Sequence, residues 1–581
     1  MFIKTTRSGK YEYLQIVKSE RINGITRHKV LMNLGRKEEI KKNPLFKRLA
    51  KKLAEITSLN ETRGNIKDLS PATIKNWGYV VYKRIWKSFK LDNFLEDLRK
   101  NDSKAEFNLS NTAFLMVLQH LLEPMSKLKT FNHKEKFAKL PNLKLPHLYR
   151  SLDILSRNKD KIEDHIFYQN YDLWNREIDI VFYDVTTFAF ESVRNDGLRD
   201  FGYSKDNKHN EVQVVMGLLI DSRGFPIGYE LFRGSTFDGK TITSALNNLK
   251  KRFAIKRVII VADRGLNSKI NLKMIKDAGY GYIVASRIKK LNEKVKEKIF
   301  DPEGYTELTS TNITTDSNID SNGLNKEDNE SKNKGDNNRR SKEDKEIFRY
   351  KVIDYTNSIR DGDRKVHKLN ENLIVTYSSA RAKRDKIDRE RLIEKARKLV
   401  EEPGRVKAYM KRGRLKYLKK VSDYEEENLS FTINEEIIKR DEEFDGYYGI
   451  QTSEKNMKVK DILNAYHTLW KIEESFRLMK STLEVRPVFH WTESRIKGHF
   501  LICFLSFLLE RELECILLRE EVSCSPEKIR EALNEMEFAE VELNGEKYYI
   551  KTKGNELSNK ILKAMHIKPP NNVLYTNEFD E

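Results

Sequence analysis

The order of apolar segments between residues 178 and 290 constrains the fold of this chain more than any other feature. Short runs rich in valine, isoleucine and aromatic residues, typical of strands, alternate there with segments of helical spacing. The predicted order is strand 178–190, strand 211–220, strand 226–232, helix 241–253, strand 257–263, helix 268–278 and strand 280–286. Three hairpin-linked strands are thus followed by two helix–strand units, which predicts a mixed α/β fold.

Two aspartates lie in this pattern among apolar neighbours. Asp184 is in the first strand, and Asp263 closes the fourth. A carboxylate in such surroundings is costly unless it is paired or holds a cation, and Mg²⁺ takes oxygen ligands from a few carboxylates, water and phosphate. Elements in this order, with acids at these two places, predict an RNase H-like α/β core. Such a core needs one more helix that carries a third acid.

That helix does not follow at once, because residues of about 291–450 have a different composition. Residues 309–346 contain no aromatic side chain and cannot bury enough apolar surface to offset the entropy of ordering, so a disordered loop is expected there. Further elements are predicted around this loop, namely strands at 347–355, 371–378 and 429–434 and a basic helix at 385–402. The core is therefore expected to be interrupted by a β-rich insertion.

The regions outside the core have patterns of their own. Residues 1–44 alternate apolar and polar side chains about an Asn23-Gly24 turn, which predicts a small basic β-ribbon. Residues 45–170 have helical spacing and fit either a DNA-end-binding module or a plain helical support. The second part of the core is expected at 451–515, followed by a C-terminal region at 516–581.

Charge and composition favour a polyanionic partner. The 581 residues carry a formal net charge of +21, which DNA or RNA would neutralise, although a basic proteome could give the same balance. No run approaches the roughly 18 uncharged apolar residues of a membrane span, and the first residues lack the apolar stretch of a signal peptide. We therefore expect a cytoplasmic protein.

Cysteine and histidine usage suggests no further site. Cys503, Cys515 and Cys524 form no CxxC pair and have no histidine cluster nearby, so neither a disulfide framework nor a zinc site is expected. His209 and His490 are interpreted as solvent-exposed or capping histidines.

The third acid is predicted on a helix that includes residues 466–480. At about 100° per residue, one quarter of its circumference carries Tyr466, Trp470, Glu473, Arg477 and Lys480. The adjacent quarter is an apolar stripe of Leu469, Ile472, Phe476, Met479 and Leu483. Glu473 and Arg477 alone would indicate only an exposed i, i+4 ion pair, but the longer stripe and the missing acidic element favour a catalytic role. Glu474 points about 100° further round and is the weaker candidate.

With these residues the chain resembles the DDE transposases of bacterial insertion sequences. The helix signature of that family, Tyr-x-x-Arg-x-x-x-Glu-x6-Lys, is matched at Tyr466, Glu473 and Lys480. Leu469 stands where the family has arginine, and Arg477 could take over the phosphate contact. The similarity covers roughly residues 110–510 and includes segments 123–127, 149–155 and 262–265.

The resemblance implies cleavage of DNA at the ends of a mobile element and transfer of the cut strand into target DNA. Asp184, Asp263 and Glu473 would hold two Mg²⁺ ions about 3.5–4 Å apart, with Mn²⁺ as a substitute. The residues implied to contact double-stranded DNA are Tyr466, Trp470, Arg477 and Lys480. Pairing of two element ends implies a homodimer on DNA.

Other interpretations of the same residues stay open. Asp184 could belong to an aspartyl-phosphate motif, although Thr186 stands where that class has its second aspartate. Asp263 could be a turn residue at a strand end. The basic run 409–420 suits a DNA backbone or a solvated strand face. A structure-selective nuclease or resolvase would use the same three acids without strand transfer, and a non-catalytic DNA-binding protein derived from a transposase would keep only the fold.

Overall fold

The computed structural model describes most of the chain, namely residues 2–22, 25–45, 48, 52, 73–137, 143–172, 180–202, 210–236, 240–253, 258–307, 347–360, 366–401, 416–421, 430–543, 546–552 and 554–575. Some predicted features lie outside these residues: the Asn23-Gly24 turn, His209, the loop at 309–346 and residues 409–415 of the basic run.

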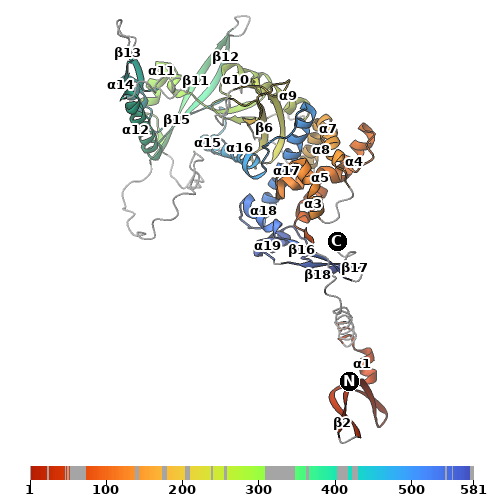
Figure 1. Cartoon of the computed structure of the whole chain (residues 1–581). Coiled ribbons are helices and arrows are strands. Elements are labelled where there is room, and N and C mark those ends of the chain that lie inside the picture. The colour runs from red at the N-terminus through yellow and green to blue at the C-terminus, as the bar shows by residue number, and fades with distance from the viewer. Residues whose placement is uncertain are drawn as a thin grey trace.

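A nine-stranded sheet in the order β10-β11-β12-β15-β9-β8-β5-β6-β7 forms the centre of the molecule (Figure 1). One half contains the predicted core elements β5 (Ile180–Ala189), β6 (Gln213–Asp221), β7 (Pro226–Arg233), α9 (Ile242–Lys251), β8 (Ile259–Ala262), α10 (Lys269–Asp277) and β9 (Gly281–Ala285). The predicted order of these elements is confirmed. β5 pairs antiparallel with β6 and parallel with β8, which in turn pairs parallel with β9.

Both faces of this half of the sheet are covered, as its nearly continuous apolar strands require. On one face, Val181, Tyr183 and Val185 of β5 belong to a hydrophobic cluster that α9 and α10 complete. On the other face, Phe182 and Phe188 join a larger cluster with α15 (Val459–His467), α16 (Trp470–Arg477) and α17 (Glu493–Arg519). The second face therefore carries the helices of the predicted site.

The insertion is less separate from the core than the sequence suggested. Its strands β10 (Thr306–Glu307), β11 (Phe348–Arg360), β12 (Val366–Ser378) and β15 (Tyr447–Thr452) extend the core sheet, because β15 pairs antiparallel with β9. A smaller unit with its own hydrophobic cluster contains α12 (Ser379–Glu401), β13 (Leu418–Val421), β14 (Ser430–Ile433) and α14 (Glu435–Glu442). The short helix η4 (Ile288–Lys290) and α11 (Glu293–Phe300) join β9 to β10.

A helical region packs around α17. It consists of α3 (Tyr79–Ser88), α4 (Leu91–Asp102), α5 (Leu109–Leu122), α6 (Lys127–Asn132), η2 (Lys134–Lys136), α7 (Leu145–Arg157) and α8 (Lys159–Asp172). Nearly every side chain of α5 is buried, as expected for a helix that is apolar all round. None of the helices among the described residues combines the length and apolar character of a membrane span.

Two smaller sheets lie outside the central one. β16 (Glu537–Leu543), β17 (Glu546–Lys551) and β18 (Val573–Tyr575) form a sheet with β4 (Thr73–Asn76), beside α18 (Pro526–Asn534) and α19 (Glu556–Ala564). The predicted helical region therefore also contains a strand. The N-terminal sheet has three strands, β1 (Phe2–Ser8), β2 (Tyr11–Ile22) and β3 (Ile25–Arg36), followed by α1 (Lys37–Lys42), and stands apart from the helical region in Figure 1.

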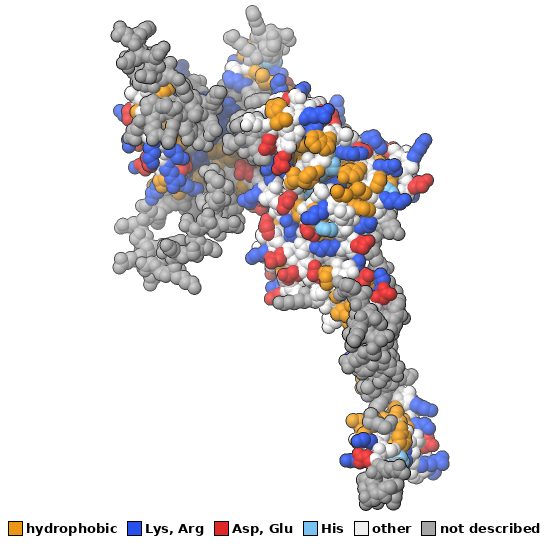
Figure 2. All heavy atoms as spheres, viewed as in Figure 1, with side chains coloured by type: hydrophobic (Ala, Val, Ile, Leu, Met, Phe, Trp, Pro, Cys, Tyr) orange, Lys and Arg blue, Asp and Glu red, His pale blue; other side chains and the backbone are white. Residues whose placement is uncertain are grey.

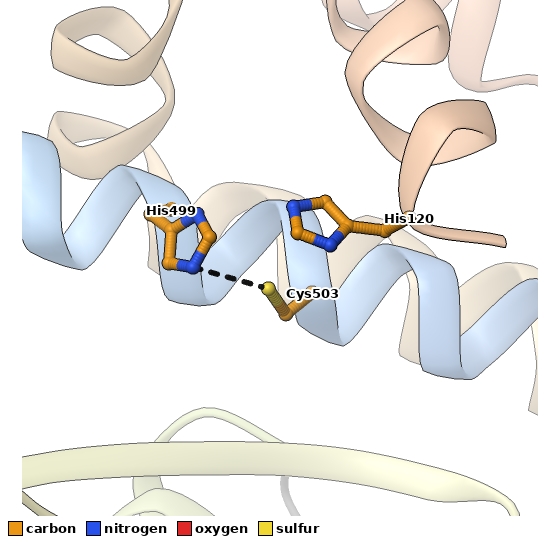
Figure 3. A group of neighbouring side chains, drawn as sticks. All are labelled: His120, His499 and Cys503. Atoms are coloured by element: carbon orange, nitrogen blue, oxygen red, sulfur yellow. Dashed lines mark hydrogen bonds between the residues drawn. The ribbon is translucent and has the colours of Figure 1, made fainter. Parts of the chain in front are cut away.

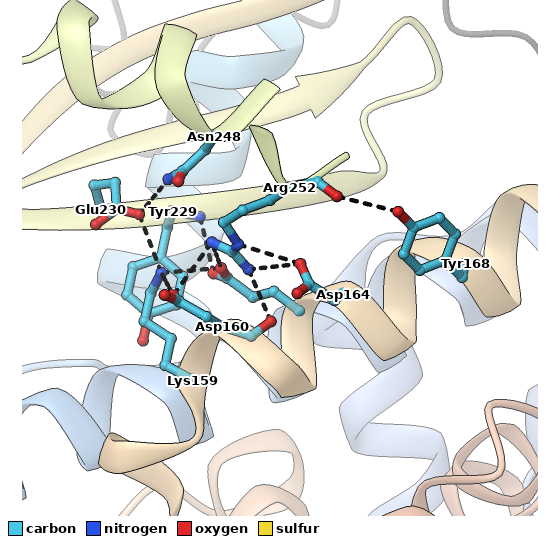
Figure 4. Close-up of polar contacts among 9 residues, drawn as sticks. Lys159, Asp160, Asp164, Tyr168, Tyr229, Glu230, Asn248 and Arg252 are labelled. Carbon is cyan, nitrogen blue, oxygen red and sulfur yellow. Dashed lines mark hydrogen bonds and ion pairs between the residues drawn. The ribbon is translucent and has the colours of Figure 1, made fainter. Parts of the chain in front are cut away.

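A buried ion-pair cluster fastens α8 to β7 and α9 (Figure 4). Glu163 of α8 is buried and accepts from Lys159 Nζ at 2.9 Å, from Arg252 Nη1 at 3.0 Å and from the backbone N–H of Tyr229 at 3.1 Å. Burial raises the pKa of Glu163, and the two cations oppose that effect. These contacts join the helical region to the core sheet.

Candidate active site

Strands β5 and β8 place Asp184 and Asp263 side by side. Phe182 and Val261 are level in the parallel ladder; Asp184 lies two residues further along β5, and Asp263 directly follows the last residue of β8. Adjacent strands lie about 4.8 Å apart. Because side chains alternate along a strand, Asp184 lies on the same face as Phe182, which belongs to the larger hydrophobic cluster. Asp263 lies close to Tyr466, which packs against the same cluster.

Helix α16 carries Glu473 on the same face of the sheet. α16 contacts β5, and α15 contacts β8. Lys471 donates from Nζ to the Ser222 carbonyl at 2.9 Å, and Glu474 pairs with Arg511 of α17 at 3.3 Å, so contacts on two flanks fix the helix. Glu473 is exposed. The ion pair of Glu474 agrees with its lower rank as a candidate ligand.

The prediction of one continuous helix from 466 to 480 is wrong. Between α15 and α16 the backbone winds more tightly, since the Leu469 N–H bonds to the Tyr466 carbonyl and the Ile472 N–H to the Leu469 carbonyl, both at 3.1 Å. After α16 it widens into the π turn η6 (Leu478–Thr482), where Leu483 N–H bonds to the Leu478 carbonyl at 2.9 Å. The positions of Tyr466 and Lys480 therefore follow from these turns rather than from even 100° spacing; π turns are frequent at functional sites.

The predicted apolar stripe is confirmed, because all five of its side chains are buried: Leu469, Ile472, Phe476, Met479 and Leu483. Burial also explains the departure from the family pattern at Leu469. This side chain is 7% exposed and lies in the larger hydrophobic cluster, whereas Arg477 is exposed on α16.

Tyr466 lies close to Asp263. Burial raises the pKa of Tyr466, and neighbouring Tyr448 and then Asp263 raise it further. The hydroxyl oxygens of Tyr466 and Tyr448 are 2.7 Å apart. The guanidinium carbons of Arg264 and Arg381 lie 5.7 and 4.5 Å from the centroid of the Tyr448 ring.

The insertion thus contributes to the site through β15 and α12. Sequence analysis missed Tyr448, Arg264 and Arg381. Only Arg264, which follows Asp263 directly, had a local signal.

Lys480 lies over a ring of the strand that carries Asp184, and Trp470 begins the helix that carries Glu473. Lys480 Nζ lies 5.7 Å from the centroid of the Phe188 ring, on β5 four residues after Asp184 and on the same face. Trp470 is half-buried at the first residue of α16. The structure therefore brings both cations, Arg477 and Lys480, to the helix that carries Glu473.

The carboxylates suit a hard divalent cation, with one qualification from geometry. Asp263 also acts as a turn residue, because its Oδ1 accepts from the Gly265 N–H at 2.7 Å, and a Cβ on Gly265 would lie 3.0 Å from that oxygen. Two aspartates from neighbouring strands and a helix-borne glutamate provide the oxygen donors that Mg²⁺ prefers. The ligand atoms of the three acids do not all lie within 4.8 Å of one another. In the described part of the chain, the ligand atoms of His120, His499 and Cys503 do lie within that distance.

This group contradicts the expectation that no histidine cluster lies near the cysteines. Cys503 does have histidines nearby, His499 one turn earlier on α17 and His120 on α5. The spacing His499-x3-Cys503 was the available signal, and a search for CxxC pairs overlooks it. The interpretation of His490 as solvent-exposed is also wrong, because this side chain is buried.

Comparisons with known proteins identify the family of this chain. Residues 2–62 match the family described as IS1634 family transposase, N-terminal domain, and residues 175–509 match the family described as Transposase DDE domain. No curated protein matches.

Solved structures of the Mos1 transposase are also similar, but only distantly. The paired-end complex with the left transposon end shares 14% identity over 31% of this chain and 60% of that chain, with a TM-score of 0.14. The pre-cleavage Mos1 transpososome shares 14% over 31% and 61%, with a TM-score of 0.14. The Mos1 mariner paired-end complex with Mn shares 13% over 34% and 66%, with a TM-score of 0.13. The match therefore spans under two thirds of those chains. Because the DDE domain match covers more than half of the 581 residues and includes all three predicted acids, the chain belongs to the DDE transposases of insertion sequences.

Proposed function

We propose that this transposase cleaves DNA strands at the ends of its element and transfers them into target DNA in a Mg²⁺-dependent reaction on an RNase H-like core. The observation that supports the proposal is that Asp184 on β5 and Asp263 at the end of the neighbouring β8 lie in the part of the sheet against which α15 and α16, the helix of Glu473, pack. Carboxylates so arranged suit phosphoryl transfer, in which charge on the phosphate oxygens must be neutralised.

In this proposal Asp184, Asp263 and Glu473 hold the metal ions, for which Mn²⁺ can substitute. When bound, the ions activate the attacking water or 3′-hydroxyl and stabilise the leaving oxygen. Lys480 and Arg477 donate charge-assisted hydrogen bonds to phosphates beside the cut. Tyr466 is oriented by Tyr448 at 2.7 Å and contacts DNA together with Trp470.

The DNA partner is double-stranded element-end and target DNA, bound by a homodimer in the cytoplasm. The net charge of +21 supports a DNA partner. Lys and Arg side chains are spread over the visible face with Asp and Glu between them (Figure 2), so net charge alone does not locate the DNA. We assign end recognition to the N-terminal sheet and the helical region, residues 1–44 and 45–170, and catalysis to residues 171–290 and 451–515, with the insertion at 291–450.

The test compares Asp184→Asn, Asp263→Asn and Glu473→Gln with the control Glu474→Gln. The substrate is duplex DNA taken from the sequence that flanks the coding region, with a supercoiled plasmid as target. Each of the three variants should lose cleavage and keep DNA binding within a few fold, while Glu474→Gln, whose acid faces Arg511, should cleave. Cleavage retained in one variant removes that residue from the site. Cleavage without joined plasmid in the unaltered protein would indicate a nuclease or resolvase.

A further inference from the structure

A cavity lies between the loop that follows α5 and the loop that follows η6. Its lining includes five cationic or imidazole side chains, His120, Lys127, Arg486, His490 and His499. We call it the Lys127 cavity. Lys127 belongs to segment 123–127, which the proposed reaction does not use.

Lys127 is a buried cation without a buried acid to balance it. Its side chain is 4% exposed, and it makes one hydrogen bond, to His120 Nε2 at 3.0 Å. Burial lowers the pKa of Lys127 to about 8. Within the described ranges no carboxylate lies within ion-pair distance of it; Glu484 lines the cavity but is exposed. An ammonium group has three N–H donors, so two are left for a ligand.

Backbone carbonyls fix the tautomers of His120 and His499. His120 donates from Nδ1 to the Leu483 carbonyl at 3.0 Å, so its Nε2 accepts from Lys127. His499 donates from Nε2 to the Val485 carbonyl at 3.0 Å, and its buried Nδ1 has no hydrogen-bond partner. His490 is buried beside them, 5.5 Å from His499 between ring centroids.

A metal ion is a poor occupant of this cluster. Figure 3 shows His120 of α5 beside His499 and Cys503 of α17. Both ring nitrogens of His120 are nevertheless engaged, and Nε2 of His499 donates to a carbonyl. The Lys127 ammonium at 3.0 Å from His120 would repel a cation. The same charge attracts an anion.

We propose that the Lys127 cavity binds a phosphate group. Lys127 supplies the charge and two N–H donors, and His490 and Arg486 line the space around it. Binding of an anion balances the buried ammonium, which no acid of the described chain balances. A charge-assisted hydrogen bond in a site shielded from water is stronger than one between neutral groups.

The position of the cavity identifies the DNA backbone as the source of that phosphate, a step that rests on the proposed function. Leu483 and Val485, whose carbonyls bind His120 and His499, directly follow the π turn that carries Lys480. The cavity lining therefore begins a few residues after Lys480, and Phe489 of that lining is 59% exposed, so DNA held at Lys480 has this phosphate site close by along the chain.

The first experiment uses inorganic phosphate and the full-length protein, without DNA or Mg²⁺. Thermal unfolding is followed in rising phosphate, with NaCl at matched ionic strength, for the unaltered protein, Lys127→Met and Lys129→Met. Lys129 is the matched control because it lies on the same helix and is exposed. Phosphate should raise the unfolding temperature of the unaltered protein and of Lys129→Met in a saturable way, and should leave that of Lys127→Met unchanged. Lys127→Gln serves as a second variant if the methionine variant does not fold.

The second experiment measures how binding to element-end DNA depends on salt. If the cavity takes a DNA phosphate, the slope of log K against log salt should be shallower by about 0.9 in Lys127→Met. An unchanged slope together with a lost phosphate effect assigns the cavity to a free phosphate. Equal phosphate stabilisation in Lys127→Met, no stabilisation at all, or stabilisation by Zn²⁺ alone would overturn the proposal. Since the phosphate measurement contains neither DNA nor Mg²⁺, its outcome is independent of whether the protein cleaves DNA.

Discussion

Two buried charges in this protein have opposite surroundings. Glu163, on α8, contacts the cations Lys159 and Arg252 and a backbone N–H. Among the described residues, Lys127, at the start of α6, donates to the neutral acceptor of His120 and lies near the buried Cys503 thiol, and it faces no carboxylate. The first charge is compensated within the fold, while the second has no acid partner among the described residues. A compensated charge is explained by structure, and an uncompensated one requires a ligand.

The largest change in the free energy of unfolding is expected at Glu163. Removing one partner of a buried ion pair leaves uncompensated charge and typically costs about 3–5 kcal/mol. Glu163→Ala should therefore lower the free energy of unfolding by about that amount, because Lys159 and Arg252 lose their shared acceptor. Urea unfolding at neutral pH measures the change.

Asp160 provides the control for that experiment. It lies in the same cluster, but its side chain is 68% exposed, and exposed pairs contribute about 0–1 kcal/mol. Asp160→Ala should thus change the unfolding free energy little. An equal loss of unfolding free energy in both variants would show that the substitutions act by weakening helix α8 and not by leaving buried charge without a partner.

A substitution at Lys127 is expected to raise the free energy of unfolding rather than lower it. Lowering its pKa from 10.5 to about 8 corresponds to about 3 kcal/mol at about 1.4 kcal/mol per pH unit. Lys127→Met removes that cost and should stabilise the protein by up to about 3 kcal/mol in phosphate-free buffer at pH 7. Such a gain in stability with a loss of function is characteristic of a functional site. A destabilised Lys127→Met would mean that the lysine is structural.

The pH dependence of this difference follows from linkage. The folded protein holds the Lys127 proton less tightly than the unfolded chain, so the cost is fully present below pH 8 and is relieved as pH rises toward 10.5. The stability advantage of Lys127→Met should shrink over that interval. The three histidines have lowered pKa values and Cys503 has one of about 12, so they titrate outside it. Urea midpoints of both proteins at pH 7.5 and 10 measure the effect.

The same contrast shows what sequence could reveal. The elements of residues 178–290 were predictable because each has a strong local period, and the pairing of β5 with β8 brings Asp184 and the end of β8 before Asp263 onto neighbouring strands. The turns around α16 were missed because no proline or glycine marks them. The pairing of β4 with β16 and the contact of His120 with Leu483 join residues far apart in the chain, and no local pattern encodes them.

The smallest effect is expected for Leu469→Arg, which would introduce a new buried cation. Leu469 is 7% exposed within the larger hydrophobic cluster, so Leu469→Arg places a charge in apolar surroundings. An arginine can extend its head group toward water, which limits the loss of unfolding free energy to about 1–3 kcal/mol. Because the side chain of residue 469 is buried at the N-terminal end of α16, we expect no rise in DNA cleavage. Arg477→Ala should lower cleavage about 10-fold or more, as loss of a charge-assisted bond implies. Leu469→Met is the control for packing. Faster cleavage by Leu469→Arg would instead show that the guanidinium reaches the DNA. In that case a cation without an acid partner would bind phosphate at residue 469 as well as at Lys127.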